Sequence, residues 1–202
     1  ESGGYITVAT AGAGDAGTVT IEARSVRVEG GSIVANTSGE GNGGSVTIRA
    51  ESVRVGPGGS SFINVTSARP SNASSDFVPG NSGAIDIVAS DSIFLTHEGG
   101  DRFSLVGVLT GRSGLSGLLS ATVSGGAGGS IKLAAPEITI TDGAIVATTT
   151  VGGGAGGSVE LRGDRISIAN GGVVDTTSLL NPFTGNPGGD AGSVTLEAND
   201  RI

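Results

Sequence analysis

The chain has 202 residues, with 39 glycines, no Cys, Met or Trp, and a formal net charge of −8. This length suffices for one domain with a sizeable core. The acidic balance argues against nucleic-acid binding, which needs clustered Lys and Arg, and the lack of Cys excludes a disulfide framework. No apolar run reaches the length of about 18 residues that a membrane span needs, so none is expected.

A glycine followed by a short alternating strand recurs along the chain. The clearest copy is Gly44–Ala50, with the sequence GSVTIRA, and edited copies begin at Gly17, Gly83, Gly129, Gly157 and Gly192. Successive copies are 27, 39, 46, 28 and 35 residues apart, so about 27 residues is the bare unit and the longer units carry insertions. A recurring unit of this length indicates a repeat architecture.

Each unit contains three strand signals with alternating apolar residues. A small-residue corner such as Ala50 separates the first two signals, and a glycine-rich corner such as 39–43 follows the third. The first signal holds Val19/Ile21, Val46/Ile48, Ile85/Ile87, Ile131/Leu133, Val159/Leu161 and Val194/Leu196. The second holds Val26/Val28, Val53/Val55, Ile93/Leu95, Ile138/Ile140 and Ile166/Ile168; the third is clearest at Ile33, Ile63, Ile145 and Val173.

The pattern predicts one domain over residues 1–202. We expect a right-handed parallel β-helix, or β-solenoid, with triangular coils of about 27 residues and three strands per coil. Like residues then stack in columns, with Val, Ile and Leu facing inward. The outward column of the first strand would place Lys132 between Asp86 and Glu160, which puts opposite charges on neighbouring strands. Stacking would also place the like charges Arg27 and Arg54 together, with Glu22, Glu29 and Glu51 near enough to relieve them.

Residues 1–16 fit the third strand of a coil, and the chain stops inside a second strand. We interpret the chain as a processed or excised segment, since it begins at Glu1 rather than Met. Two alternatives stay open: a piece of a longer solenoid, or copies that stack end to end. The candidate edge residues for stacking are Tyr5, Ile6, Val8, Val194, Leu196 and Ile202.

Three insertions, at about 67–82, 97–116 and 178–191, leave from the corners and are expected to form loops on the lateral flank. They carry most of the phenylalanines and four of the six prolines. We therefore take them as candidate interaction loops. The candidate residues are Arg69, Phe77, Arg102, Phe103, Arg112 and Phe183.

The repeated G-[ST]-[VI]-x-[IL]-x-A, followed by [VI]-x-[VI], G-[GA]-x-[IV] and a Gly/Asn-rich corner, resembles the repeats of filamentous-haemagglutinin-like exoproteins. These are the large surface proteins of bacterial two-partner secretion. The resemblance covers nearly the whole chain outside the insertions. It implies a right-handed parallel β-helix, export to the cell surface, and a role in adhesion or in the extracellular matrix.

Candidate chemistry is sparse. Asp86 and Glu160, two strands apart on one column, have the spacing of an inverting glycosidase pair, but Lys132 between them favours charge neutralisation. We interpret His97 as a solvated loop histidine rather than a metal ligand or a base. The corners at Asp15 and Asp190 resemble calcium-binding glycine/aspartate repeats, but the nonapeptide does not recur, so we expect structural turns without metal.

The sequence therefore predicts a non-enzymatic structural or adhesive segment of an extracellular bacterial filament, stalk or surface exoprotein. We expect no catalytic residues, cofactor or metal. The expected partners are further copies of the chain, end to end or lateral, and surface glycans. The alternative is a carbohydrate-binding or polysaccharide-degrading β-helix that uses the flank loops. Ice binding ranks last, because charges interrupt the outward threonine column.

Overall fold

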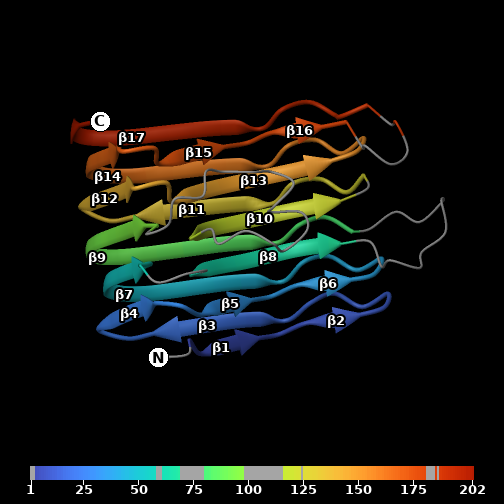
Figure 1. Cartoon of the computed structure of the whole chain (residues 1–202), viewed down its shortest axis with the longest axis horizontal. Coiled ribbons are helices and arrows are strands. Elements are labelled where there is room, and N and C mark those ends of the chain that lie inside the picture. The colour runs from blue at the N-terminus through green and yellow to red at the C-terminus, as the bar shows by residue number, and fades with distance from the viewer. Residues whose placement is uncertain are drawn as a thin grey trace.

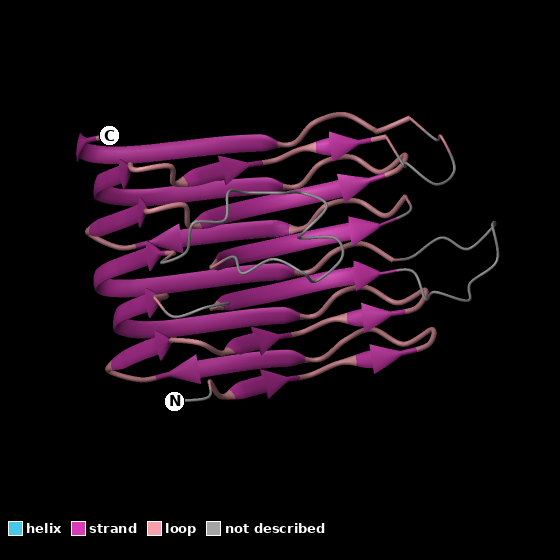
Figure 2. Ribbon diagram, viewed as in Figure 1, coloured by secondary structure: helices cyan, strands magenta, loops and turns pink. Residues whose placement is uncertain are grey.

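The computed structural model describes residues 3–57, 61–68, 80–97, 116–123, 125–180, 185 and 187–202. In these ranges every regular element is a β-strand and there is no helix (Figure 2). The strands form two sheets, and in both sheets they stack from the N-terminal end of the chain to the C-terminal end (Figure 1). All recorded pairings are parallel, which confirms the predicted all-β, parallel class of fold and is compatible with a β-helix.

The nine-stranded sheet contains the segments that the sequence predicted as third strands. Alternation with a two-residue period makes these segments strands, because it gives each of them one inward face. Its members are β1 (Tyr5–Thr7), β2 (Thr10–Ala11), β5 (Ser32–Val34), β6 (Thr37–Ser38), β8 (Phe62–Ala68), β10 (Gly117–Val123), β13 (Ile145–Val151), β15 (Val173–Asp175) and β16 (Ser178–Leu179). The main path through the sheet is β1, β5, β8, β10, β13, β15, with β2 paired to β6 and β16 to β13.

The eight-stranded sheet contains both the first and the second strand signals of each unit. Its members are β3 (Thr18–Glu22), β4 (Ser25–Val28), β7 (Ser45–Val55), β9 (Ala84–Thr96), β11 (Ser130–Ala134), β12 (Glu137–Thr141), β14 (Ser158–Ile168) and β17 (Ser193–Arg201). β3 and β4 both pair with β7, and β7 pairs with β9. β11 and β12 lie between β9 and β14, and β17 pairs with the other edge of β14.

The small-residue corner between these two signals differs from the expectation. In β7, β9, β14 and β17 the strand continues through it. The register shifts there instead, between Ala50 and Ser52 and between Gly163 and Arg165. A small side chain lets the strand bend at this point while parallel pairing continues on both sides.

The strand register matches the repeat alignment. Val46 pairs with Val19 on one side and with Ile85 on the other, and Ile131 pairs with Ile85 and Val159. In the nine-stranded sheet Ile33 pairs with Ile6 and Ile63. Because a slip of one residue would turn each apolar set to the opposite face, the alternating pattern fixes this register.

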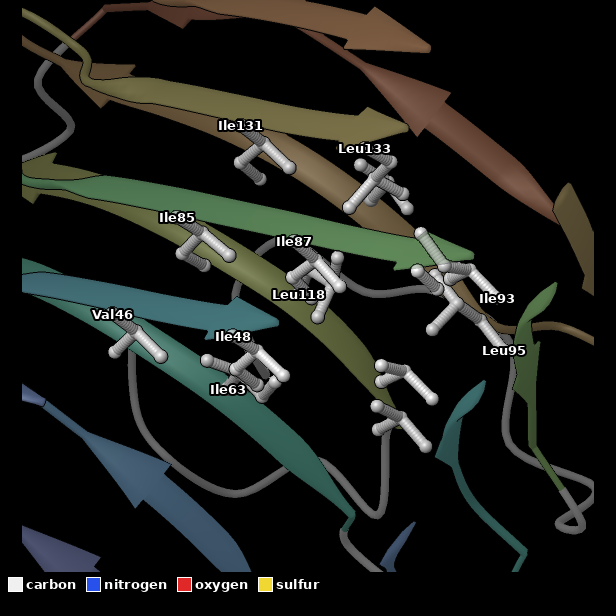
Figure 3. Close-up of a cluster of buried hydrophobic side chains, with 14 of the residues drawn as sticks. Val46, Ile48, Ile63, Ile85, Ile87, Ile93, Leu95, Leu118, Ile131 and Leu133 are labelled. Atoms are coloured by element: carbon white, nitrogen blue, oxygen red, sulfur yellow. The ribbon is translucent and has the colours of Figure 1, made fainter. Parts of the chain in front are cut away.

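The core lies between the two sheets and consists of aliphatic columns. Val46, Ile85 and Ile131 are fully buried, as are Ile48 and Ile87. Figure 3 shows these side chains from successive strands pointing into the same interior. The predicted inward columns are thus confirmed. Close packing of branched side chains in such columns is a main source of stability here.

The repeated glycine lies where each unit returns to the eight-stranded sheet. A Cβ built on Gly83 would lie 1.7 Å from the carbonyl oxygen of Gly44, and one on Gly129 would lie 1.8 Å from that of Gly83. Contacts this short exclude any side chain. The glycine therefore recurs in the sequence because the backbones of successive units leave no room for a side chain at this position.

Candidate functional site

The outward face of the eight-stranded sheet carries a row of polar and charged side chains. Thr47 pairs with Thr20 and Asp86, and Lys132 pairs with Asp86 and Glu160. The Lys132 Nζ lies 3.7 Å from the Glu160 Oε2. Glu160 also accepts a hydrogen bond from the Arg162 Nε. The Glu160 carboxylate thus has two cations against it in a surface ion-pair network. Lys132 lies between Asp86 and Glu160 as predicted, but it forms an ion pair with Glu160 and not with Asp86.

A second outward column places Arg27 beside Arg54, as predicted. The Glu29 carboxylate lies between them, 3.5 Å from the Arg27 Nη1 and 3.9 Å from the Arg54 Nε. The Arg54 guanidinium also lies over the Phe94 ring, 4.6 Å from its centroid. This cation–π contact, which the sequence did not reveal, together with Glu29 offsets the repulsion between the two arginines.

The corner before the repeated glycine holds a polar ladder. The Asp15 Oδ1 accepts hydrogen bonds from the backbone N–H of Asn42 at 2.7 Å and from its Nδ2 at 3.0 Å. The Asn42 Oδ1 in turn accepts the N–H of Asn81 at 2.9 Å, and the Asn81 Oδ1 accepts the N–H of Ala127 at 2.9 Å. Each side chain thus satisfies a backbone donor of the next unit.

Sequence reasoning missed this ladder, although a signal exists. Asp15, Asn42, Asn81 and Asp190 each stand two residues before a repeated glycine. A polar side chain at the same place in several units predicts stacking along the corner. The Asp15 carboxylate accepts two hydrogen bonds in this ladder. Within the described ranges, no group of three or more His, Cys, Asp or Glu side chains could hold a metal ion.

An open groove of about 890 Å³ runs along the same corner. It crosses every unit, because glycine and serine recur there in each of them. Its walls are Gly-Gly-Ser or similar triplets, and Asp15 is its one titratable lining residue. The groove follows from the close backbone approach at the glycines, and it offers hydroxyl and peptide groups rather than a catalytic constellation.

His97 is not a solvated loop residue, so that prediction was wrong. Its side chain is 3% exposed, and its Nδ1 lies 3.3 Å from the Ser116 Oγ. Within the described chain its Nε2 is buried without a hydrogen-bond partner. The residue directly follows β9, where the chain still faces the interior, and Ser116 directly precedes β10. That contact between residues far apart in sequence has no local signature.

The two ends of the stack carry the predicted edge residues. Tyr5 and Ile6 on β1 are 75% and 47% exposed, and Val194 on β17 is 44% exposed. Ile202, just beyond β17, is 70% exposed. Val8 and Leu196 differ, because both are partly buried and pack against the core.

Polar groups surround the last strand on the outward side. The Arg165 Nε donates to the Asp200 Oδ2 at 3.0 Å, and the Asn199 Nδ2 donates to the Asp164 Oδ1 at 2.8 Å. The hydrogen bond that Arg165 donates to Asp200, together with the charge of that carboxylate, raises the pKa of Arg165. These contacts fasten β17 to β14 beside their register shift.

The candidate residues of the predicted interaction loops fall in parts of the chain that the structure does not describe. The candidates Arg69, Phe77, Arg102, Phe103, Arg112 and Phe183 all lie outside the described residues. The flanking strands can be placed: β8 extends to Ala68, and β16 covers Ser178–Leu179, so regular pairing reaches into the expected ends of two insertions.

Comparison with known proteins found no matching family model, and no curated protein or solved structure matches the chain. In the described part of the chain there is no helix that could span a membrane.

Proposed function

We propose that this chain is a structural or adhesive segment of an extracellular bacterial filament, stalk or surface exoprotein. Its fold would be a right-handed parallel β-helix with triangular coils of about 27 residues, three strands per coil and insertions on one flank. The repeat pattern of filamentous-haemagglutinin-like exoproteins, which this chain resembles, supports both statements. Further copies of the chain and surface glycans are the partners that such a segment would bind.

The observation that carries the proposal is the parallel register that the first-strand positions of all six units share. Partner residues continue from β3 through β7, β9, β11 and β14 to β17 without reversal. Backbone hydrogen bonds therefore run along the stacking axis, and a dry aliphatic core runs beside them. Such a stack resists local opening, since each strand inside it is held on both sides.

The surface chemistry supports a scaffold rather than an enzyme. Asp86 and Glu160 are the two carboxylates with glycosidase spacing, and the Glu160 charge is neutralised by Lys132 and Arg162. Further charges lie in exposed pairs, among them Arg24 with Glu51 at 3.7 Å. Networks of this kind keep a stacked surface soluble and contribute little to stability.

Labelling of intact cells tests the extracellular location. Antibodies raised against the chain should bind cells of the source organism before permeabilisation, whereas antibodies against a cytoplasmic protein should bind only afterwards. Labelling that requires permeabilisation would contradict the proposal.

A second assay tests the scaffold role against the carbohydrate-active alternative. The purified chain is incubated with a panel of bacterial and plant polysaccharides, and reducing ends are measured. We expect no release above a heat-denatured sample. Sustained release would identify an enzyme and overturn the structural function, while binding on a glycan array without release would agree with adhesion.

A further inference from the structure

We propose that Arg27, Arg54 and a row of serines beside them bind an acidic glycan through the carboxylate of a uronic acid. The site lies on the outward face of the eight-stranded sheet, where β4 pairs with β7 and β7 pairs with β9 (Figure 1). This inference rests on the proposed function, because it names the chemical class of the surface glycan and the side chains that bind it.

The two guanidinium groups of this site share one carboxylate. Arg27 and Arg54 are paired on neighbouring strands, which lie about 4.8 Å apart, so two like charges stand side by side. In the described chain, Glu29 is the one acidic side chain that forms an ion pair with either of them. Two positive charges thus face one negative charge, and a ligand carboxylate would supply the second.

The contacts with Glu29 leave N–H donors of both guanidinium groups unused. The Glu29 Oε1 lies 3.5 Å from the Arg27 Nη1 and 3.9 Å from the Arg54 Nε, whereas charge-assisted N–H···O bonds are about 2.7–2.9 Å long. Elsewhere on this sheet the Arg165 Nε donates to the Asp200 Oδ2 at 3.0 Å. Within the described ranges neither Arg27 nor Arg54 donates a side-chain hydrogen bond, so both can donate to a ligand.

The Phe94 ring holds the guanidinium of Arg54 in position. The guanidinium carbon lies 4.6 Å from the ring centroid, within the range of a cation–π contact. This contact fixes the side chain without engaging an acceptor oxygen. A planar guanidinium matches the two oxygens of a carboxylate, and a side chain that is already ordered loses less entropy on binding.

A row of hydroxyl groups lies beside the two arginines. Ser25, Ser52 and Ser92 are paired across the same three strands, two residues before the members of the arginine column, so they share its outward face. In the described chain the Ser25 and Ser52 hydroxyls have no hydrogen-bond partner, and Ser92 donates to the Asp91 Oδ2 at 3.1 Å. Hydroxyl groups both donate and accept, as those of a sugar do. A uronic acid carries a carboxylate and hydroxyls on one ring, which matches this row and the arginines together.

The net charge of −8 opposes an anionic ligand at long range. At an ionic strength of 0.15 M the screening length is about 8 Å, so distant acidic groups are largely screened while the contacts at the site are not. At about 1 M salt the length falls to roughly 3 Å, and the contacts of an exposed site weaken as well. We therefore expect binding at physiological salt and its loss at high salt.

Isothermal titration calorimetry with oligomannuronate, an oligomer of a uronic acid, tests the site. The matched probe is the carboxyl-reduced form of the same oligosaccharide, which keeps the hydroxyls and lacks the charge. The reduced form should bind about tenfold more weakly, and Arg54→Gln should weaken binding of the acidic form by about tenfold, since each removes hydrogen bonds between charged groups. Arg54→Lys keeps the charge but loses the planar fork, so it should weaken binding several-fold.

Three further variants separate the contributions. Glu29→Gln removes the competing carboxylate and should raise the affinity several-fold. Phe94→Leu leaves Arg54 in place but removes the ring that holds it, so the affinity should fall several-fold. Arg162→Gln is the control, because it removes one positive charge from another column of the same face and should bind as the unchanged chain does. Circular dichroism of each variant verifies that it is folded.

Other results would overturn the proposal. They are no binding of oligomannuronate to the unchanged chain, equal binding of its carboxyl-reduced form, or equal losses in Arg162→Gln and Arg54→Gln, which would mean attraction by general charge. Polyglutamate, which offers carboxylates without sugar hydroxyls, should bind more weakly; equal affinity would indicate a site for acidic peptides instead. A chain that labels intact cells but binds no oligomannuronate would overturn this site and leave the proposed function standing.

Discussion

Two threonines on β13 show that the hydrogen bonding of a buried hydroxyl decides whether it stabilises or destabilises the folded chain. Thr148 and Thr150 are both fully buried, and both side chains lie on the same face of the strand. The Thr150 Oγ1 donates to the carbonyl oxygen of Ala155 at 3.0 Å. The Thr148 Oγ1 has no partner in the described chain. A buried hydroxyl without a partner is destabilising, whereas a bonded one contributes about 1 kcal/mol.

Valine substitutions at these positions should therefore have opposite effects. Thr148→Val should raise the free energy of unfolding by about 1 kcal/mol, because it replaces an unsatisfied hydroxyl with a methyl group of similar size. Thr150→Val should lower it by about 1 kcal/mol, because it removes a hydrogen bond. Urea unfolding followed by circular dichroism measures both. Equal effects of the same sign would contradict the assignment of the two hydroxyls.

At the scale of the element, the recurring glycine sets how closely successive units stack. Gly83→Ala would place a methyl group 1.7 Å from the carbonyl oxygen of Gly44, so β7 and β9 must separate. We expect a loss of about 3 kcal/mol in stability, in the range for overpacked positions. Gly153→Ala is the matched control, since its added Cβ would meet nothing within 4 Å. Thermal unfolding should show a large fall in Tm for the first variant and little change for the second.

The corner ladder makes a separate contribution. Asn81→Ala removes the acceptor of the Ala127 N–H and should cost about 1 kcal/mol. Asn81→Asp keeps an acceptor oxygen and imitates Asp15, so it should retain most of the stability. Amide hydrogen exchange at Ala127 should quicken only in the alanine variant. Similar exchange in both variants would mean that the side chain does not protect this donor.

The strand register could be predicted from the sequence because it depends on local information. The glycine anchor and the two-residue alternation assign Val46 and Ile131 to one inward column without any knowledge of the loops. The continuity of β7 through Ala50 could not be predicted, since a small residue is equally compatible with a corner between two strands and with a bend inside one strand. The burial of His97 was missed because Ser116, its partner, is distant in the sequence. Phe77 and the other loop candidates stay untested predictions.

At the scale of the whole molecule, stability has one main physical origin. The sheets gain a strand with each unit, and each strand buries its aliphatic residues against the columns of the units on either side. Stacked repeats of this kind derive their stability from contacts between neighbours. The same property explains why the exposed large hydrophobic residues of the described chain lie near its first and last strands.

Methyl NMR tests the central claim, the in-register parallel stack, most directly. In a sample with labelled Ile, Leu and Val methyl groups, Ile87 should show cross-peaks to Ile48 on one side and to Leu133 on the other, because these residues are paired neighbours. Ile48 should show none to Leu161, three strands away at about 14 Å. Missing contacts from Ile87, with its methyl groups accessible to a water-soluble paramagnetic agent, would contradict the account.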